Sequence, residues 1–163
     1  MTDTPTAIDP IADQIRAPRP KAGSRSWLIL AGLIVACLGV GILASFATSE
    51  SVVTWYPTLE KPFFNPPNWL FGPVWSVLYV AMAVAAWLVW RSPHEGPDKP
   101  AALRLFAVQL VANAAWSFAF FGAQSPALGM VVVIALLTLV GLTGLRFLRI
   151  LPLAGVLFVP YFA

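Results

Sequence analysis

Long apolar stretches separated by short polar segments make up most of the chain. They predict helices over residues 27–47, 69–90, 102–122 and 127–148. A helix rises about 1.5 Å per residue, so about 20 residues cross the roughly 30 Å hydrocarbon core of a bilayer. Backbone polar groups in lipid must be paired within the segment, which favours helices over irregular chain. The pattern therefore predicts four membrane-spanning helices.

A fifth apolar stretch covers residues 150–163, and its 14 residues would rise only about 21 Å as a helix. We expect this helix to be incomplete here, with the natural chain continuing. The alternatives are a helix that sits shallow in the bilayer, or a form of low stability. Alternating segments of about 10 residues, typical of a membrane β-barrel, are not found. The predicted fold is all-α, an integral membrane bundle of five helices with the fifth truncated.

Composition supports a membrane location. Apolar residues make up 59% of the chain and charged residues 10%, against about 45–50% and about 25% in soluble domains. Residues 1–26 are polar, rich in proline and basic at their end, and predict a disordered tail before one membrane domain over 27–163. A cleaved signal peptide is disfavoured, because the first apolar stretch is too long and begins too late.

Basic residues are concentrated at one end of the predicted helices. The loop over 48–68 and the turn after residue 122 together hold one, Lys61. The positive-inside rule then predicts a cytoplasmic N-terminus and places the 48–68 loop on the opposite side. The other nine are Arg16, Arg19, Lys21, Arg25, Arg91, Lys99, Arg104, Arg146 and Arg149.

Several function classes have no support in the residues. Cys37 is the one cysteine, and His94 lies in a polar loop without other ligands nearby, so no metal site is expected. No phosphate-binding glycine loop, Ser–His–acid set or pair of carboxylates inside an apolar stretch is present, so no catalytic residues are assigned. No basic patch with interleaved aromatic residues indicates nucleic-acid binding.

The loop before the second helix is rich in aromatic residues and proline. Tyr56, Lys61 and Pro66 lie in it, and Trp75 and Tyr79 follow on one face of the helix, at positions i and i+4. Prolines stiffen such a loop, so it could cover a pocket at low ordering cost. The alternative is an aromatic belt at the membrane surface. Both interpretations stay open from the residues alone.

One stripe of the third helix carries polar and aromatic residues. Gln109, Asn113, Trp116 and Ser117 follow at positions i, i+4, i+7 and i+8. Amides at membrane depth normally face the interior of a bundle. They could hold helices together by hydrogen bonds, or they could line a ligand site with the indole.

The aromatic, proline and amide residues follow one another in an order that is specific to one family. In this order the chain resembles the TspO/MBR family, which contains the translocator protein, or peripheral-type benzodiazepine receptor, and the bacterial tryptophan-rich sensory proteins. The resemblance covers residues from about 27 to the end. It rests on Trp55, Tyr56, Leu59, Glu60, Lys61, Pro62, Pro66, Pro67, Trp69, Gly72, Pro73, Val74, Trp75, Leu78, Tyr79, Gln109, Leu110, Asn113, Trp116, Ser117, Phe120, Phe121, Gly122, Pro160 and Tyr161.

The resemblance implies a five-helix bundle, often dimeric, with a pocket below the first loop. In the family this pocket binds porphyrins such as protoporphyrin IX, haem-like tetrapyrroles, sterols and benzodiazepine-type ligands. Lys61 could supply a partner for a propionate. The family pattern continues past Pro160-Tyr161, and the wall that it supplies is absent from this sequence. Matching positions place in the pocket Tyr56, Pro66, Trp75, Tyr79, Asn113 and Trp116.

The resemblance implies a membrane receptor or translocator for a tetrapyrrole such as porphyrin or haem, bound as a ligand and not as a required cofactor. Other flat apolar ligands are expected to bind too, and the role would be tetrapyrrole or stress regulation. One alternative is an enzyme that promotes photo-oxidative porphyrin breakdown at Trp75 or Trp116. The other is a structural membrane module without a ligand. Small residues at four-residue spacing also allow a homodimer.

Overall fold

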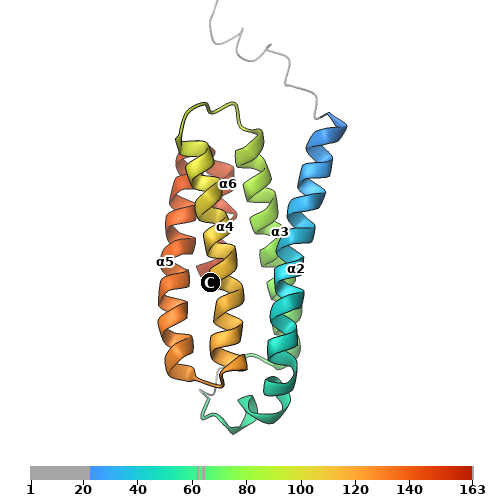
Figure 1. Cartoon of the computed structure of the whole chain (residues 1–163), viewed down its shortest axis with the longest axis vertical. Coiled ribbons are helices and arrows are strands. Elements are labelled where there is room, and N and C mark those ends of the chain that lie inside the picture. Colours follow the sequence, from blue (N-terminus) through green and yellow to red (C-terminus); the bar gives the residue numbers. More distant parts are fainter. Residues whose placement is uncertain (1–22, 62, 64, 163) are drawn as a thin grey trace, which may run out of the picture.

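Four long antiparallel helices form the body of the protein (Figure 1). The computed structural model describes residues 23–61, 63 and 65–162, and this part of the chain contains no strand. Each of the four helices is long and apolar enough to cross a bilayer, which confirms the predicted all-α membrane bundle. They are α2 (Ser24–Thr54), α3 (Asn68–Arg91), α4 (Asp98–Ser117) and α5 (Pro126–Ile150).

The helices close into a ring. α2 packs against α3 and α4, and α4 packs along α5. The ring is completed by α6 (Pro152–Val156), which lies between α5 and α3, and the short 3-10 helix η3 (Val159–Phe162) follows it. The 48–68 loop lies at one end of the ring with the α4–α5 turn, and the α3–α4 loop lies at the other (Figure 1).

Two helices extend beyond their apolar stretches. α2 continues to Thr54, into the predicted loop, and α4 begins at Asp98, before the predicted start at residue 102. Hydropathy indicates the depth of a segment in the bilayer, whereas a helix continues into the headgroup region wherever polar residues tolerate helical geometry. α2 also begins at Ser24, so the predicted tail is shorter than 1–26, and residues 1–22 lie outside the described residues.

The fifth apolar stretch, predicted as a short helix over 150–163, forms a short apolar helical segment over Pro152–Phe162, made of α6 and η3, and only its start differs. Ile150 is the last residue of α5, and Leu151 is extended, with φ −151° and ψ 110°. The chain then turns back, and Pro152 starts α6, because proline fits a first helical turn but cannot continue a helix that precedes it. α6 packs closely against the end of α5 at Gly155. A Cβ at this position would lie 2.6 Å from the Cα of Leu148, so a larger residue would not fit.

Small side chains on α3 allow the other helices to approach it. Ala83, Ala85 and Ala86 are fully buried there, beside Met82 and Val89. Many large apolar side chains on all four long helices point outward, which suits a protein surrounded by lipid. Exposed examples are Val35, Phe46, Val77, Val111, Val131 and Leu145.

Candidate functional site

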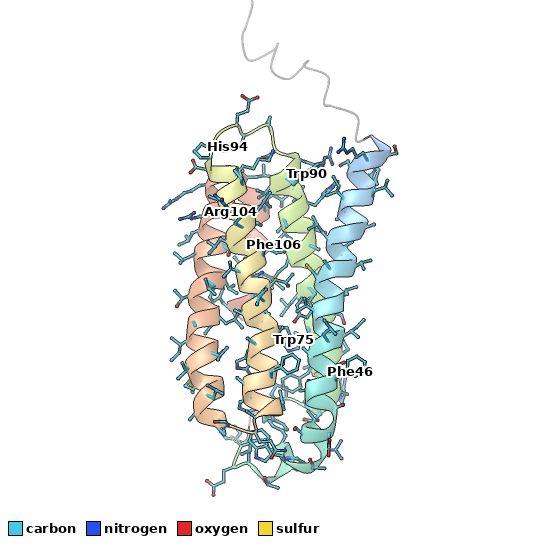
Figure 2. All side chains as sticks on the ribbon, viewed as in Figure 1. Phe46, Trp75, Trp90, His94, Arg104 and Phe106 are labelled. Carbon is cyan, nitrogen blue, oxygen red and sulfur yellow. The ribbon has the colours of Figure 1, made fainter. Side chains whose placement is uncertain are left out.

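Three aromatic rings meet in the half of the bundle nearer the 48–68 loop. Trp75 and Tyr79, one turn apart on α3, have ring centroids 5.9 Å apart. Tyr161 of η3 meets the Trp75 ring edge-on at 5.7 Å. Figure 2 shows Trp75 between the helices in this half, while Trp90 lies near the opposite end. The spacing predicted that Trp75 and Tyr79 share a face, and the structure places that face toward the chain's own C-terminal segment.

A chain of hydrogen bonds continues from these rings to α4. The Tyr161 hydroxyl donates to Asn113 Oδ1 at 2.8 Å, and Asn113 Nδ2 donates to Gln109 Oε1 at 3.3 Å. Gln109 Nε2 reaches the sulfur of Met82 at 3.5 Å, a weak acceptor. Both amides are buried, at 0% and 2% exposure. We call this set the inner group: Trp75, Tyr79, Gln109, Asn113 and Tyr161.

A second group of rings lies one turn further along α4. The α-helix ends at Ser117 and continues as a π-helical turn, η2 (Phe118–Gly122), in which the Ala123 N–H donates to the Phe118 carbonyl at 2.8 Å. π-turns inside helices occur frequently at functional sites. This turn brings Phe120 and Phe121 to the same side as Trp116.

The rings of this second group contact one another closely. Phe120 stacks on the Trp116 indole, with centroids 5.4 Å apart and planes 10° apart. Phe121 meets Trp116 edge-on at 5.9 Å and lies 5.8 Å from the Tyr56 ring. Trp55 adds a further edge contact to Phe120, at 5.4 Å. We call this set the loop group: Trp55, Tyr56, Trp116, Phe120 and Phe121.

The 48–68 loop is folded around Tyr56. The Tyr56 hydroxyl donates to Asn65 Oδ1 at 2.9 Å. Lys61 Nζ donates to the Tyr56 carbonyl at 3.0 Å and lies 4.3 Å from the centroid of the Tyr56 ring. Pro66 is exposed, and its carbonyl accepts a bond from Asn65 Nδ2 at 3.2 Å. The Lys61 ammonium is thereby held at the exposed edge of the loop group.

The predicted site residues fall into these two groups. Trp75, Tyr79 and Asn113 belong to the inner group, which Tyr161 joins together. Tyr56 and Trp116 belong to the loop group, where they share Phe121. Lys61 and Pro66 lie at its exposed edge. Their roles in ligand binding stay predictions.

Two parts of the arrangement were missed from the residues. Phe120 and Phe121 read as ordinary apolar positions, because nothing in a run of phenylalanines signals a π-turn. Tyr161 was noted only as part of the resemblance, although it is the one hydroxyl-bearing ring in the last apolar stretch. Such a residue needs a partner when it is buried, and the buried amides of α4 were candidates for that partner.

A separate apolar cleft lies nearer the other end of the bundle. Its volume is about 330 Å³, and it opens between α2 and α4 over α3. Because its walls are almost entirely hydrocarbon, it offers almost no hydrogen bonds to a polar ligand. Its lining residues are Ile29, Leu33, Ala36, Cys37, Ala86, Trp90, Leu103, Phe106, Ala107 and Leu110.

The fold and the site together define a class: a multi-pass helical membrane protein in which buried amides and aromatic rings meet under a proline-rich loop. The model of the TspO/MBR family matches residues 33–163, so the chain belongs to the TspO/MBR family. The resemblance found from the aromatic and proline positions is thereby confirmed.

Curated relatives agree with this assignment. The chain is 41% identical over 138 residues to the "Tryptophan-rich protein TspO" of Chlorobaculum tepidum, a match that covers 85% of this chain and 87% of the relative. It is 44% identical over 109 residues to the protein of the same name from Archaeoglobus fulgidus, with 67% and 70% covered. The human "Translocator protein" is 34% identical over 139 residues, with 84% and 82% covered.

Proposed function

We propose that the protein is a membrane receptor or translocator for a tetrapyrrole of the porphyrin or haem type, bound at the loop end of the bundle. The observation that carries the proposal is the adjacency of the two groups along α4. Asn113 and Trp116 stand one turn apart, Asn113 bonded to Tyr161 of the inner group and Trp116 stacked on Phe120 of the loop group. A flat conjugated ligand favours stacking on an indole, and its polar edge favours a nearby amide or ammonium.

The loop end suits such a ligand better than the apolar cleft does. A porphyrin carries carboxylates, and a buried carboxylate without donors is strongly unfavourable. Lys61 lies at the exposed edge of the loop group, whereas the cleft near Trp90 has almost no polar surface. Phe120 covers one face of Trp116, so stacking on that face requires the Phe120 ring to turn away.

The test is a titration of the full chain in detergent with a porphyrin. Binding is measured from the quenching of the protein's tryptophan fluorescence. A planar porphyrin should quench saturably with one ligand per chain. An uncyclised tetrapyrrole with the same two carboxylates should bind at least several-fold more weakly, because it cannot stack as one plane. Equal binding of the two would contradict a slot for a flat ligand, and linear, unsaturable quenching would indicate partition into detergent.

The second candidate is an enzyme that breaks porphyrins down by photo-oxidation. The position of Trp116 beside the proposed ligand favours this candidate. An indole stacked on a light-excited porphyrin can exchange an electron with it, and dioxygen from the air is then the oxidant that breaks the porphyrin ring down. Illumination of the complex in air should then convert the porphyrin to new products faster than illumination of the Trp116→Phe variant does. A receptor or translocator would leave the porphyrin unchanged beyond the rate found without protein.

A further inference from the structure

A charged hollow lies at the end of the bundle opposite the 48–68 loop. It has a volume of about 310 Å³ and forms where the last turns of α5 meet the start of α4. His94, Asp98, Arg146, Arg149 and Ile150 line it. Figure 2 shows His94 at this end, on the loop that joins α3 to α4. Four ionisable side chains in one hollow contrast with a chain of which only 10% is charged.

Among the described residues, neither arginine of this hollow makes an ion pair. Within the part of the chain that the structure describes, the one ion pair joins His94 Nε2 to Asp98 Oδ2 at 4.0 Å. Asp98 lies on the rim, with 82% of its side chain exposed. Arg146 and Arg149 therefore line the hollow without forming an ion pair to Asp98, its one acidic lining residue.

Two other basic residues at this end, Arg91 and Lys99, are engaged by the chain. The Arg91 guanidinium lies 4.5 Å from the centroid of the Trp87 ring. Lys99 Nζ donates to the Ser92 carbonyl at 2.7 Å. The hollow differs from the rest of this basic end because its two arginines lie one turn apart on α5 and line the same recess.

The hollow lies at the depth of lipid headgroups. α5 has 25 residues, so it is about 37 Å long, longer than the roughly 30 Å hydrocarbon core. Its last turns, with Arg146 and Arg149, therefore reach the headgroup region. Below them, the outward side chains of α5 are apolar, and Leu142, Leu145 and Leu148 are exposed. A phosphate above a run of exposed leucines matches the shape of a phospholipid.

We propose that this hollow binds the headgroup of an anionic glycerophospholipid. Arg146 and Arg149 donate to its phosphate oxygens, since guanidinium is suited to paired bonds with phosphate. The acyl chains lie along the exposed leucines of α5. Basic pockets between transmembrane helices are known to take anionic headgroups. The two rival explanations are a general attraction of positive charge to the membrane surface and a site for a free phosphate compound.

The experiment measures lipid retained by the full chain in uncharged detergent, by native mass spectrometry. Phosphatidylglycerol and phosphatidylcholine with identical acyl chains are added in turn. We expect phosphatidylglycerol to bind more tightly, and we expect Arg146→Gln/Arg149→Gln to weaken it roughly thirtyfold, the effect of losing two direct charge pairs to the phosphate. The matched control is Arg25→Gln/Arg91→Gln, which removes the same charge at the same end and should weaken binding at most twofold.

Each other outcome overturns the proposal. Equal losses in the two double variants would indicate general surface charge, and equal binding of the two lipids would exclude recognition of the anionic headgroup. Displacement of phosphatidylglycerol by an equal concentration of glycerol 3-phosphate would assign the hollow to a free phosphate compound. If the glutamine variant loses its helical circular dichroism, Arg146→Lys/Arg149→Lys replaces it. That variant keeps both charges but loses the planar fork, so a several-fold loss is expected and unchanged affinity contradicts the proposal.

Discussion

The inner group and the loop group lie one turn apart on α4, but the protein holds them in different ways. The inner group is tied by directional bonds from Tyr161 to Asn113 and from Asn113 to Gln109, all within the bundle. The loop group is held mainly by ring contacts around Trp116 and Phe120, with exposed Lys61 at its edge.

This difference assigns separate tasks to the two groups. Buried hydrogen bonds are costly to break, because a freed donor or acceptor finds no water there. Ring contacts near the surface are broken at lower cost and can be replaced by contacts to a ligand. We therefore expect the inner group to determine stability and to stay in place, and the loop group to rearrange when a ligand enters.

The largest expected difference between the loop and the buried interior is in access from outside. Thr58, exposed in the loop, should react as Thr58→Cys with an impermeant thiol reagent added to intact cells. Cys37, which is fully buried, should stay unlabelled in the same sample. Ser51 is a poor labelling position, because its side chain is buried and its hydroxyl donates to the Phe121 carbonyl. Labelling of Thr58→Cys only after the membrane is opened would reverse the predicted orientation.

The next largest effect should come from breaking the inner group. Asn113→Ala removes the acceptor of the Tyr161 hydroxyl and the donor to Gln109 Oε1. The free energy of unfolding in detergent should therefore fall by about 1–3 kcal/mol. Tyr161→Phe removes one donor and should have about half that effect. Val111→Ala, on the same helix but exposed to lipid, is the control. Equal stability of all three variants would mean that the network contributes nothing.

A smaller effect is expected for the corresponding change in the loop. Tyr56→Phe removes the bond to Asn65 Oδ1, but both residues are only partly buried, so water can take the place of the lost partner. Chemical denaturation should show a loss of about 0.5 kcal/mol, the low end for one hydrogen bond. A loss as large as that of Asn113→Ala would show that the loop is as firmly fixed as the interior.

The smallest effect concerns Lys61, which is exposed. Lys61→Gln should weaken binding of a porphyrin dicarboxylate by about twofold, as expected for an exposed charge pair. The loss should shrink at high salt, because screening weakens such pairs. Binding of the porphyrin dimethyl ester should not change. An equal loss for the ester would mean that Lys61 acts through its contact with Tyr56 and not through charge.

Most of the fold could be predicted from the pattern of apolar residues. The four long helices follow from uncharged stretches of membrane length, because lipid leaves the backbone few other choices. The predicted ends of the helices were less accurate, since polar residues such as Thr48 and Glu50 continue α2 without any change in helical geometry. The break between the fourth and fifth helices was predicted between residues 148 and 150 and lies at Leu151, just before Pro152, where a helix can restart.

The candidate site was predicted in part. The spacing of Gln109, Asn113 and Trp116 indicated an inward stripe, and the two amides are indeed buried. The pairing of Asn113 with Tyr161 depends on how η3 folds back against α4, and no local pattern encodes a contact between residues so distant in sequence. The π-turn at Phe118–Gly122 was equally hidden, because its residues are compatible with an ordinary helix.

The most direct test of the account compares two tryptophans at opposite ends of the bundle. Trp116 is at the centre of the loop group, whereas Trp90 lines the apolar cleft. Porphyrin affinity is measured from fluorescence quenching in Trp116→Ala and Trp90→Ala. The account predicts a loss of about 1–3 kcal/mol for Trp116→Ala, the size of one stacking contact, and no measurable loss for Trp90→Ala. A loss confined to Trp90→Ala would move the ligand to the cleft, and unchanged affinity in both variants would leave the aromatic groups without a role in binding.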